Sequence, residues 1–464
     1  MAQRRYHLWT IGCQMNRADS YRVGEELEKR GYAPTDRPEL ADIVVLNTCV
    51  VRQRAEDKVR GRLSSLSSLK RSNRHVALVV MGCFVDDVEA LQASYPYVDA
   101  FLKPSDVAGV ADFAENLNSP VALQTSSGDF ATPSRVADLV PISYGCDHRC
   151  TYCIVALRRG RQRSRPLSEI MDDAERLVRR GTRQITLLGQ NVDAYGSDLE
   201  GQPDLADVLS ALHDLDGLWR IRFLTSHPRD MSQRIIDAVA GLPKVCECWE
   251  LAVQAGDDAI LRRMGRGYTV DHFRDLVARI GQATPHCAIN TDIIVGFPGE
   301  TRKQFENTLR LVRQMRFDVA HVAAYSPRPG TRAAGWIDDV TPEEKEYRRA
   351  LVEQVQKEIA TEINAAQLGQ EVEILVDGHQ RGRWRGRTRT NKLVFFESKD
   401  DWLGKMARVR ITWTGPWSMI ADRPAIPHPV PSPCGECCRI WLRAGAHRRR
   451  SRHSRGDGSL HPQG

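Results

Sequence analysis

The sequence predicts an α/β protein of three folded domains followed by a basic tail. Two stretches of the chain alternate apolar, strand-like segments with helical patterns, which is typical of parallel sheets covered by helices. A third stretch, nearer the C-terminus, contains only short strand-like segments. A length of 464 residues with 41% hydrophobic side chains is enough for several separate cores. We expect domains at 1–120, 133–366 and 367–421, and a disordered tail at 422–464.

The first domain begins with three apolar segments, YHLWTIGC, ADIVVLNTC and HVALVVMGC, which are separated by two helical patterns. This βαβαβ order predicts a parallel sheet. Each segment ends in a cysteine, which is Cys13, Cys49 or Cys83. Because parallel strands end at one edge of a sheet, where α/β sheets bind ligands, we expect the three thiols to converge on a metal site rather than to fill the core. Three thiols at this edge are compatible with either a zinc ion or an iron–sulfur cluster.

A polar stretch rich in serine and threonine, from about Gly109 to Arg135, is predicted to be a linker. Six strand-like segments follow it, separated by helical patterns, and they predict a partial (β/α)6 barrel of parallel strands. Their sequences are LVPISYGC, QITLLGQNV, WRIRFLTSH, CWELAVQAG, NTDIIVGFPGE and VAHVAAYSPRPG. In such barrels the chemistry takes place at the C-terminal strand ends.

A long charged helix, from about Thr341 to Leu368, follows the barrel strands, and after it comes a small all-β barrel. From Asp422 the chain is rich in proline and then in arginine and histidine, which predicts disorder. This tail holds eight arginines against three acids and carries most of the net charge of +7, so a nucleic-acid interface must be argued from local patches. Its Cys434, Cys437 and Cys438 resemble a fragment of a metal site without a convincing set of partners.

The loop after the first barrel strand, ISYGCDHRCTYCIVALRRGRQRSRP, contains Cys146, Cys150 and Cys153 at x₃ and x₂ spacing. Thiolates are soft ligands that suit iron–sulfur clusters. A structural zinc site would need a fourth ligand, and His148 inside the loop could supply it. The position at the end of a barrel strand favours a reactive cluster instead, with one iron open to bind a substrate.

The same spacing, with Tyr152 before the last cysteine, resembles the signature of the radical S-adenosylmethionine (SAM) superfamily. The resemblance implies that the three cysteines hold a [4Fe–4S] cluster and that SAM chelates its fourth iron. An electron from the cluster then cleaves SAM to a 5′-deoxyadenosyl radical, so that the cofactor carries the hard chemistry.

Further motifs narrow this resemblance to the radical SAM methylthiotransferase family. GCQMNRADS and LNTCVVRQRAEDKVRGRL resemble its N-terminal domain, LLGQNVDAYG, RFLTSHP and DIIVGFPGET its radical SAM core, and GRTRTNKLVFF its TRAM RNA-binding module. The family implies a second, auxiliary [4Fe–4S] cluster on Cys13, Cys49 and Cys83, which carries the sulfur that is inserted. The chain departs from the family pattern in having ELAVQ where His-x-Pro-Val-Gln is usual, and Ala156 where proline is usual.

The implied activity is SAM-dependent methylthiolation at C2 of N6-dimethylallyladenosine 37 in tRNA. Two other targets within the family are threonylcarbamoyl-adenosine 37 and an aspartate of a ribosomal protein. A non-catalytic, metal-stabilised RNA-binding protein is the alternative from another class. Residues at the strand ends and in the cluster loop are expected to hold SAM, namely Tyr152, Gly189, Gln190, Thr225, Ser226, Gln254, Gly296 and Pro298.

Two arginine runs are candidates for binding RNA phosphates, since arginine forks match phosphate oxygens. In the run after the cluster loop we expect Arg158, Arg161 and Arg163 to do so. In RGRWRGRTRT, the arginines alternate with other residues, and strand side chains alternate between faces. If this segment is extended throughout, five arginines share one face, and a hairpin turn at a glycine would split them. We expect the phosphate contacts there from Arg383, Arg385 and Arg387.

The chain has no apolar run of about 18 residues and no evident secretory signal, so we expect a cytoplasmic protein without a membrane partner. Its twelve cysteines are then thiols or metal ligands rather than disulfides. The resemblance implies the tRNA anticodon loop as a partner and an electron donor such as flavodoxin or ferredoxin. We expect a monomer.

Overall fold

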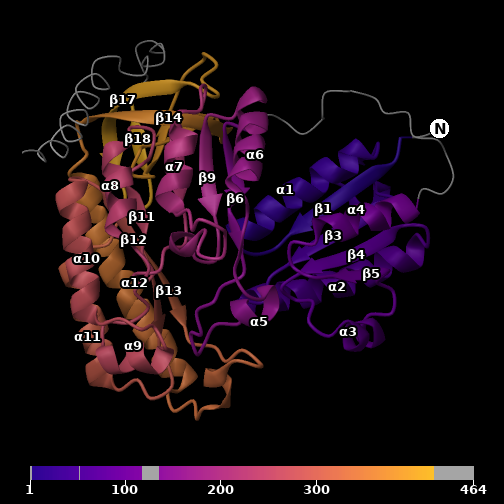
Figure 1. Ribbon diagram of the computed structural model, residues 1–464, viewed down its shortest axis with the longest axis horizontal. Helices are drawn as coiled ribbons and strands as arrows, with labels where there is room; N and C mark the ends of the chain where they lie inside the picture. Colours follow the sequence, from indigo (N-terminus) through magenta and orange to yellow (C-terminus); the bar gives the residue numbers. More distant parts are fainter. Residues whose placement is uncertain (1–2, 52, 118–134, 423–464) are drawn as a thin grey trace, which may run out of the picture.

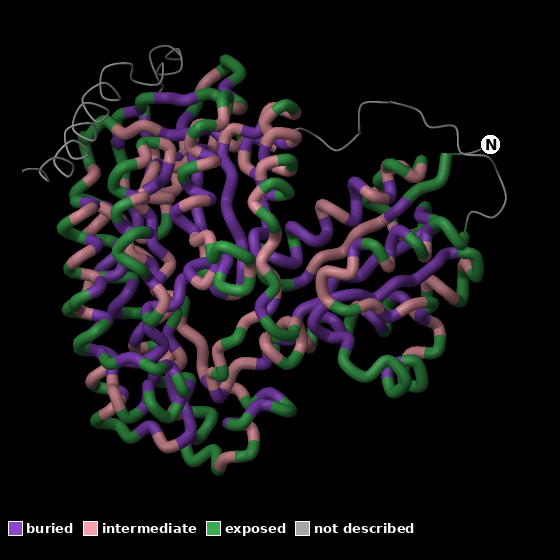
Figure 2. Tube along the Cα trace, in the orientation of Figure 1, coloured by how far each residue is buried: buried purple, intermediate pink, exposed green. Residues whose placement is uncertain are grey.

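The computed structural model describes residues 3–51, 53–117 and 135–422 of the chain. The predicted disorder of the tail and its three cysteines lie outside these residues. The described chain forms an N-terminal α/β domain, a larger α/β core and a small β-barrel (Figure 1). In both α/β parts the strands are the buried centre and the helices are the outer layer (Figure 2).

The N-terminal domain is a five-stranded parallel sheet with the strand order β2-β1-β3-β4-β5. Successive side chains of β3 point to opposite sides of the sheet, so Ile43 and Val45 pack with α1 and α4, while Val44 and Leu46 pack with α2. The predicted parallel sheet is confirmed. The strands are β1 (Arg5–Thr10), β2 (Ala33–Pro34), β3 (Ile43–Thr48), β4 (Ala77–Gly82) and β5 (Ala100–Leu102), and the helices are α1 (Gln14–Lys29), η1 (Pro38–Leu40), α2 (Gln53–Ser72), α3 (Val88–Ser94) and α4 (Val107–Asn116).

Helix α4 corrects the predicted linker, which was expected to begin near Gly109. The side chain of Asp106 accepts a hydrogen bond from the backbone of Gly109 and so caps the helix. Val107, Val110 and Ala114 then recur at helical spacing and pack into the core beside α1. This short apolar pattern ends just before the polar stretch that suggested a linker.

The core contains the six predicted parallel strands, arranged as two sheets with the orders β6-β9-β10 and β11-β12-β13. Isolated parallel bridges, Ile221 with Val245 and Ser226 with Leu251, connect the two sheets into a partial barrel. A small antiparallel pair, β7 and β8, flanks the three-cysteine loop. The strands are β6 (Ala137–Pro141), β7 (Ser143–Tyr144), β8 (Arg163–Ser164), β9 (Gln184–Leu188), β10 (Arg220–Phe223), β11 (Cys248–Glu250), β12 (Ala288–Val295) and β13 (Val319–Ala324).

Helices cover the outside of this barrel, and the last of them, α12, packs along β13. The predicted long helix after the barrel is therefore confirmed as part of the core. The helices are α5 (Val155–Arg159), α6 (Leu167–Arg179), η2 (Val192–Ala194), α7 (Leu205–His213), α8 (Gln233–Gly241), α9 (Asp258–Met264), α10 (Val270–Ala283), α11 (Arg302–Met315), η3 (Arg332–Gly335) and α12 (Pro342–Ala365).

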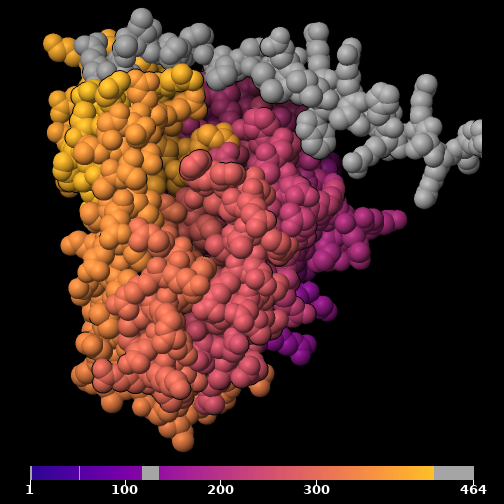
Figure 3. Space-filling view, turned by 90° about the vertical axis from the view of Figure 1, so that its left-hand side faces the viewer, coloured from indigo at the N-terminus to yellow at the C-terminus, as the bar shows by residue number. Residues whose placement is uncertain are grey.

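The C-terminal part is a closed barrel with the strand order β14-β15-β16-β18-β17, as predicted for the all-β segment. Figures 1 and 3 show it seated directly on one end of the core. Within the described ranges, no helix combines the length and apolar character that crossing a membrane requires. The strands are β14 (Glu371–Gln380), β15 (Arg383–Arg387), β16 (Leu393–Phe396), β17 (Met406–Thr414) and β18 (Met419–Ala421).

The turn between β15 and β16 closes the core at the N-terminal ends of its strands. Arg220 and Arg222 of β10 are buried, and they donate hydrogen bonds to the carbonyl oxygens of Arg387, Thr388 and Arg389. The opposite, C-terminal strand ends therefore stay available for the N-terminal domain and the cysteine loop.

Candidate functional site

The cysteines of the N-terminal domain lie together at one sheet edge. Cys49 and Cys83 directly follow the neighbouring strands β3 and β4, and Cys13 is the N-cap residue of α1. The three thiols interact electrostatically with one another. Burial raises the pKa of Cys49 to about 11, and Cys13 and Cys83 add to this rise because neighbouring thiolates would repel one another. Such a group ionises readily only around a cation that offsets its charge.

The backbone before Cys13 is built for close approach to Cys49. Gly12 has a φ of +123°, and a Cβ atom there would lie 2.4 Å from the Cβ of Cys49 and 3.0 Å from its Sγ. The buried amide of Asn16 donates hydrogen bonds of 2.8 Å to the carbonyl oxygens of Ile11 and Thr48. The turns that carry two of the cysteines are therefore fixed to each other.

The second group, Cys146, Cys150 and Cys153, lies in the loop between β7 and α5. Burial raises the pKa of Cys153 to about 12, and Cys150 and Cys146 contribute in the same direction. Gly145 has a φ of +73°, and a Cβ atom there would lie 2.0 Å from the carbonyl oxygen of Arg161, so only glycine fits before Cys146. These three thiols therefore also form a compact set of soft ligands.

Arg266 is a residue near this loop that the sequence reasoning missed. Its side chain is buried; Nη1 lies 3.5 Å from Sγ of Cys150, and Nη2 donates to the carbonyl oxygen of Ala252 at 2.7 Å. It stands between two glycines in the left-handed region, Gly265 and Gly267. The signal in the sequence was this pattern, GRG, directly after an amphipathic helix. Arg266 therefore places a fixed positive charge beside one of the candidate cluster ligands.

His148, considered above as a zinc ligand, interacts with two residues that follow β10. Its Nε2 lies 2.5 Å from a carboxylate oxygen of Asp230, which also accepts a hydrogen bond of 2.6 Å from Asn191. Its ring stacks on that of His227 with the centroids 3.9 Å apart and the planes within 12°. His148, His227 and Asp230 could together approach one metal ion. However, the in-plane lone pairs of two stacked imidazoles do not point at a common centre.

Among the residues predicted to hold SAM, some have unusual backbone geometry and some have buried side-chain oxygens, and Gln254 has both. Thr225 and Gln254 have φ values of +73° and +72°, which are rare for residues other than glycine. The side-chain oxygens of Gln190 and Gln254 are buried without a hydrogen-bond partner in the described chain. Buried polar atoms normally have partners, so these two oxygens suit contacts with a bound ligand. Tyr152 packs edge-on against Phe297, with the ring centroids 6.2 Å apart.

Other predicted SAM residues have structural partners. The hydroxyl of Ser226 donates to Asp193 at 2.9 Å. A Cβ atom on Gly189 would lie 2.6 Å from Oγ of Ser143, and one on Gly296 would lie 2.3 Å from the side chain of Lys345. Pro298 is buried beside these strand ends. Close packing therefore accounts for the glycines without a ligand.

The arginines of the first run lie in different surroundings. Arg158 forms an ion pair of 2.7 Å with Asp86 of the N-terminal domain. Arg161 is 89% exposed and Arg163 is exposed on β8, so both are accessible to a phosphate. Arg159, between them in the chain, has a side chain that is only 4% exposed.

The second run does not place five arginines on one face. Arg381 and Gly382 both have positive φ and form the hairpin turn between β14 and β15, which splits the set. Arg389 lies beyond β15 and pairs with Glu247 of the core at 2.6 Å. The segment is therefore not extended throughout, and the alternative of a hairpin turn at the first of the two glycines is the one observed.

Three of these arginines do share a face of β15. Arg383, Arg385 and Arg387 alternate with Trp384 and Gly386 along the strand, and the latter two face the barrel interior. All three are partly exposed and lie near acids. Arg383 is 2.9 Å from Glu397, and Arg385 and Arg387 are 2.7 and 3.8 Å from the shared Asp377.

The two cysteine groups meet at the interface between the N-terminal domain and the core. Ile154, the residue after Cys153, packs in one apolar cluster with Cys49 and Cys83. Nearby, Met15 of α1 packs with Leu188 at the C-terminal end of β9. Figure 1 shows helix α5 of the core beside the ends of the N-terminal sheet. Six thiols from distant parts of the chain thus belong to a single region.

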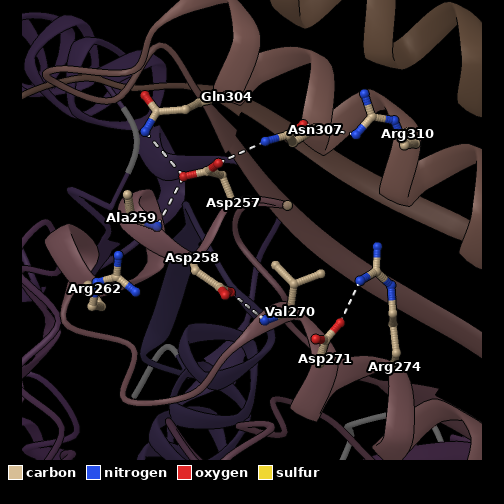
Figure 4. A pocket seen from close by; sticks show the side chains of 11 residues that line it. Asp257, Asp258, Ala259, Arg262, Val270, Asp271, Arg274, Gln304, Asn307 and Arg310 are labelled. Carbon is tan, nitrogen blue, oxygen red and sulfur yellow. Dashed lines mark hydrogen bonds and ion pairs between the residues drawn. The ribbon is translucent and has the colours of Figure 1, made fainter.

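A polar pocket lies elsewhere, on the helical outer layer between α9, α10 and α11 (Figure 4). Its side chains satisfy one another. Asp257 accepts hydrogen bonds from Gln304 and Asn307, and Arg274 donates to Asp271. The pocket contains none of the residues predicted for the site.

Three family descriptions match separate parts of the chain. Residues 5–103 match Uncharacterized protein family UPF0004, residues 140–312 the Radical SAM superfamily, and residues 365–422 the TRAM domain. In solved structures, the radical S-adenosylmethionine methyltransferase TsrM from Kitasatospora setae, with cobalamin and a [4Fe-4S] cluster bound, is similar over 72% of this chain and 77% of that chain. The TM-score of 0.53 at 12% identity shows a shared fold.

Curated relatives match nearly the whole chain. A tRNA-2-methylthio-N(6)-dimethylallyladenosine synthase of Roseiflexus sp. (strain RS-1) is 51% identical over 427 residues, which cover 90% of this chain and 89% of the relative. The protein of the same name from Herpetosiphon aurantiacus is 47% identical over 427 residues, covering 90% of this chain and 97% of the relative. A third, from Chloroflexus aurantiacus, is 48% identical.

Proposed function

The chain belongs to the tRNA-2-methylthio-N(6)-dimethylallyladenosine synthases, and we propose that it methylthiolates C2 of N6-dimethylallyladenosine 37 in tRNA. The observation that carries the proposal is the meeting of two cysteine groups at one interface. Sulfur insertion needs a radical to remove hydrogen from carbon and a sulfur donor close to that carbon. Two clusters on either side of one substrate would meet both needs.

The superfamily implies SAM and one [4Fe–4S] cluster, and we assign that cluster to Cys146, Cys150 and Cys153. The donor set fits, because three soft thiols lie together and Arg266 offsets part of their charge. When bound, the cluster and SAM supply the radical. The protein's part is to hold the loop rigid, through the hydrogen bonds that Thr151 makes with the carbonyl oxygens of Arg263 and Met264.

We assign the auxiliary [4Fe–4S] cluster to Cys13, Cys49 and Cys83. The mutual electrostatic contact of the thiols and the burial of Cys49 and Cys83 support a cluster with three protein ligands. Cys13 is the N-cap residue of the 16-residue helix α1, so the positive end of the helix dipole would face a negatively charged cluster held there.

For SAM itself we propose contacts from Gln190 and Gln254, whose side-chain oxygens are buried without a partner in the described chain, and from Thr225, whose backbone is strained like that of Gln254. Tyr152 would shield the cluster loop from water through its packing on Phe297. For tRNA we propose Arg161 and Arg163 near the site and the arginine face of β15, because each presents exposed guanidinium groups.

We also propose that domains extend over 1–120, 133–366 and 367–421, and that the enzyme works as a cytoplasmic monomer reduced by a flavodoxin or ferredoxin. The nine cysteines of the described residues are all free thiols, which is the state expected in a reducing compartment.

Mass spectrometry of tRNA nucleosides from a strain that lacks this gene tests the function. We expect the 2-methylthio derivative to disappear and N6-dimethylallyladenosine to accumulate, and the intact gene should restore the modification. If the strain instead loses methylthiolated threonylcarbamoyl-adenosine, or a methylthiolated ribosomal protein, then the assigned target is wrong.

A further inference from the structure

Arg159 is a residue of the core whose side chain lies inside the N-terminal domain. It ends helix α5, six residues after Cys153, and its side chain is 4% exposed. Nη2 donates a hydrogen bond of 2.8 Å to Asn16, and Nη1 donates one of 2.8 Å to Ser105. The guanidinium also lies close enough to the thiol of Cys83 for the two groups to interact electrostatically. One side chain thus connects the loop of one cysteine group to a ligand position of the other.

Arg159 and Asp19 form a buried pair within one hydrogen-bond network. Asp19 is 1% exposed, lies 3.6 Å from the guanidinium and also accepts a hydrogen bond from Ser105. Because the guanidinium is buried, its anionic neighbours and hydrogen-bond acceptors must lie within the protein. A cluster held beside Cys83 would add negative charge to these surroundings.

Asn16 extends the contact of Arg159 to the other two N-terminal cysteines, because its side chain forms hydrogen bonds in both directions. Its side-chain oxygen accepts from Arg159, while its amide holds the turns that carry Cys13 and Cys49. The thiol of Cys13 also lies 3.7 Å from the same oxygen of Asn16. The guanidinium therefore contacts the surroundings of all three N-terminal cysteines, directly or through one amide.

We propose that Arg159 is a positioning residue for the N-terminal cluster: from the core domain it places a guanidinium beside Cys83, one of that cluster's sulfur ligands, and keeps the surroundings of the cluster positively charged. This inference rests on the cluster assigned to Cys13, Cys49 and Cys83 in the proposed function. Hydrogen bonds and positive charge near a cluster favour its reduced, more negative form. Arg159 thus makes the potential of the N-terminal cluster depend on correct docking against the core.

The test uses the reconstituted full-length protein with Cys150→Ala, so that only the N-terminal cluster remains. Into this parent we introduce Arg159→Gln, which removes the charge, and Arg159→Lys, which keeps it with fewer donors. Arg176→Gln is the matched control, because Arg176 also links core and N-terminal domain, by a 2.8 Å ion pair with Glu25. Among the described residues, its ion-pair and hydrogen-bond partners are carboxylates and not cysteines.

Iron content, the electron paramagnetic resonance spectrum of the reduced cluster and its midpoint potential are measured for each protein. We expect Arg159→Gln to shift the potential downward and change the spectrum, or to lose the iron, with partial recovery in Arg159→Lys and no change in Arg176→Gln. Identical potentials and spectra in Arg159→Gln and the parent would overturn the inference, and so would an equal effect of Arg176→Gln, which would indicate docking alone. A parent without iron would overturn the auxiliary cluster itself.

Discussion

Replacing Arg383, Arg385 and Arg387 with glutamine should weaken tRNA binding and reduce its dependence on salt. Each phosphate that an arginine neutralises contributes a slope of roughly 0.7 to 0.9 to the logarithm of affinity against the logarithm of salt concentration. If all three contacts are made, the dissociation constant of the unaltered protein should rise roughly 20- to 40-fold more than that of the variant between about 50 and about 200 mM salt.

Acidic residues of the barrel that already pair with these arginines could reduce the number of phosphate contacts, and so the change in salt dependence. Arg385 and Arg387 share Asp377, which can retain one of them when RNA binds. Glu397 is 72% exposed and holds Arg383 only weakly, because exposed ion pairs contribute about 0 to 1 kcal/mol. With two contacts rather than three, the extra rise is roughly 7- to 12-fold.

Equilibrium binding of unmodified tRNA over a salt series measures both quantities. The matched control changes Lys405, Arg408 and Arg410 to glutamine, which removes the same charge from exposed positions at β17 of the same barrel. A control that flattens the salt slope as much as the β15 variant would show that net charge, and not this face, attracts the tRNA. An unaltered slope in the β15 variant would refute the assignment directly.

Three further changes test the site. Cys150→Ala should leave roughly half of the iron, held by the N-terminal group, and abolish reductive SAM cleavage; cleavage at the normal rate would contradict the ligand assignment. Cys49→Ala should still form 5′-deoxyadenosine under reductant but no methylthiolated tRNA, and a variant that makes product would mean that these cysteines are structural. Burial raises the pKa of Glu250 from 4.5 to about 7, so the folded state holds this proton more tightly than the unfolded state does and loses stability as pH rises through that interval. Glu250→Gln should remove roughly 3 kcal/mol of this loss, measured as a smaller change in the unfolding midpoint of the metal-free protein between pH 5 and pH 8; equal pH dependence in both proteins would show that Glu250 is ionised throughout.

The parts of the fold that follow from local pattern were predictable from the sequence. Apolar segments of strand length between helical patterns identified β1, β3 and β4 of the N-terminal sheet and the six parallel strands of the core, but not the short strands β2, β5 and β8. Parallel order alone placed Cys49 and Cys83 at one sheet edge. Helix α4 was missed because its apolar pattern is short and precedes a long polar stretch. The hairpin at Arg381 was obscured because arginine rarely adopts a positive φ, whereas the alternation of arginines was conspicuous.

The side chains that complete the site were harder to predict, because their roles depend on contacts between distant segments. Arg159 looked like one member of a phosphate-binding run, yet its helix docks against the N-terminal domain and directs it to Cys83. Arg266 reaches Cys150 across 116 residues of sequence. The Gly-Arg-Gly pattern marks Arg266 as unusual but does not identify its partner, and both contacts arise only when separate elements pack together.

The C-terminal barrel packs directly on the core, and this contact determines what a truncation of the chain would do. Arg220 and Arg222 are 1% and 5% exposed, and backbone oxygens of the turn after β15 are among their acceptors. A chain shortened before residue 367 would lose these acceptors and would expose to water Val136 and Trp219 of the core, which pack with Leu375 and Met406 of the barrel. The RNA-binding module therefore cannot be removed without affecting the core. Its removal would weaken the catalytic core as well as the grip on tRNA, and the two losses could be separated only by substitutions on the outer face of the barrel.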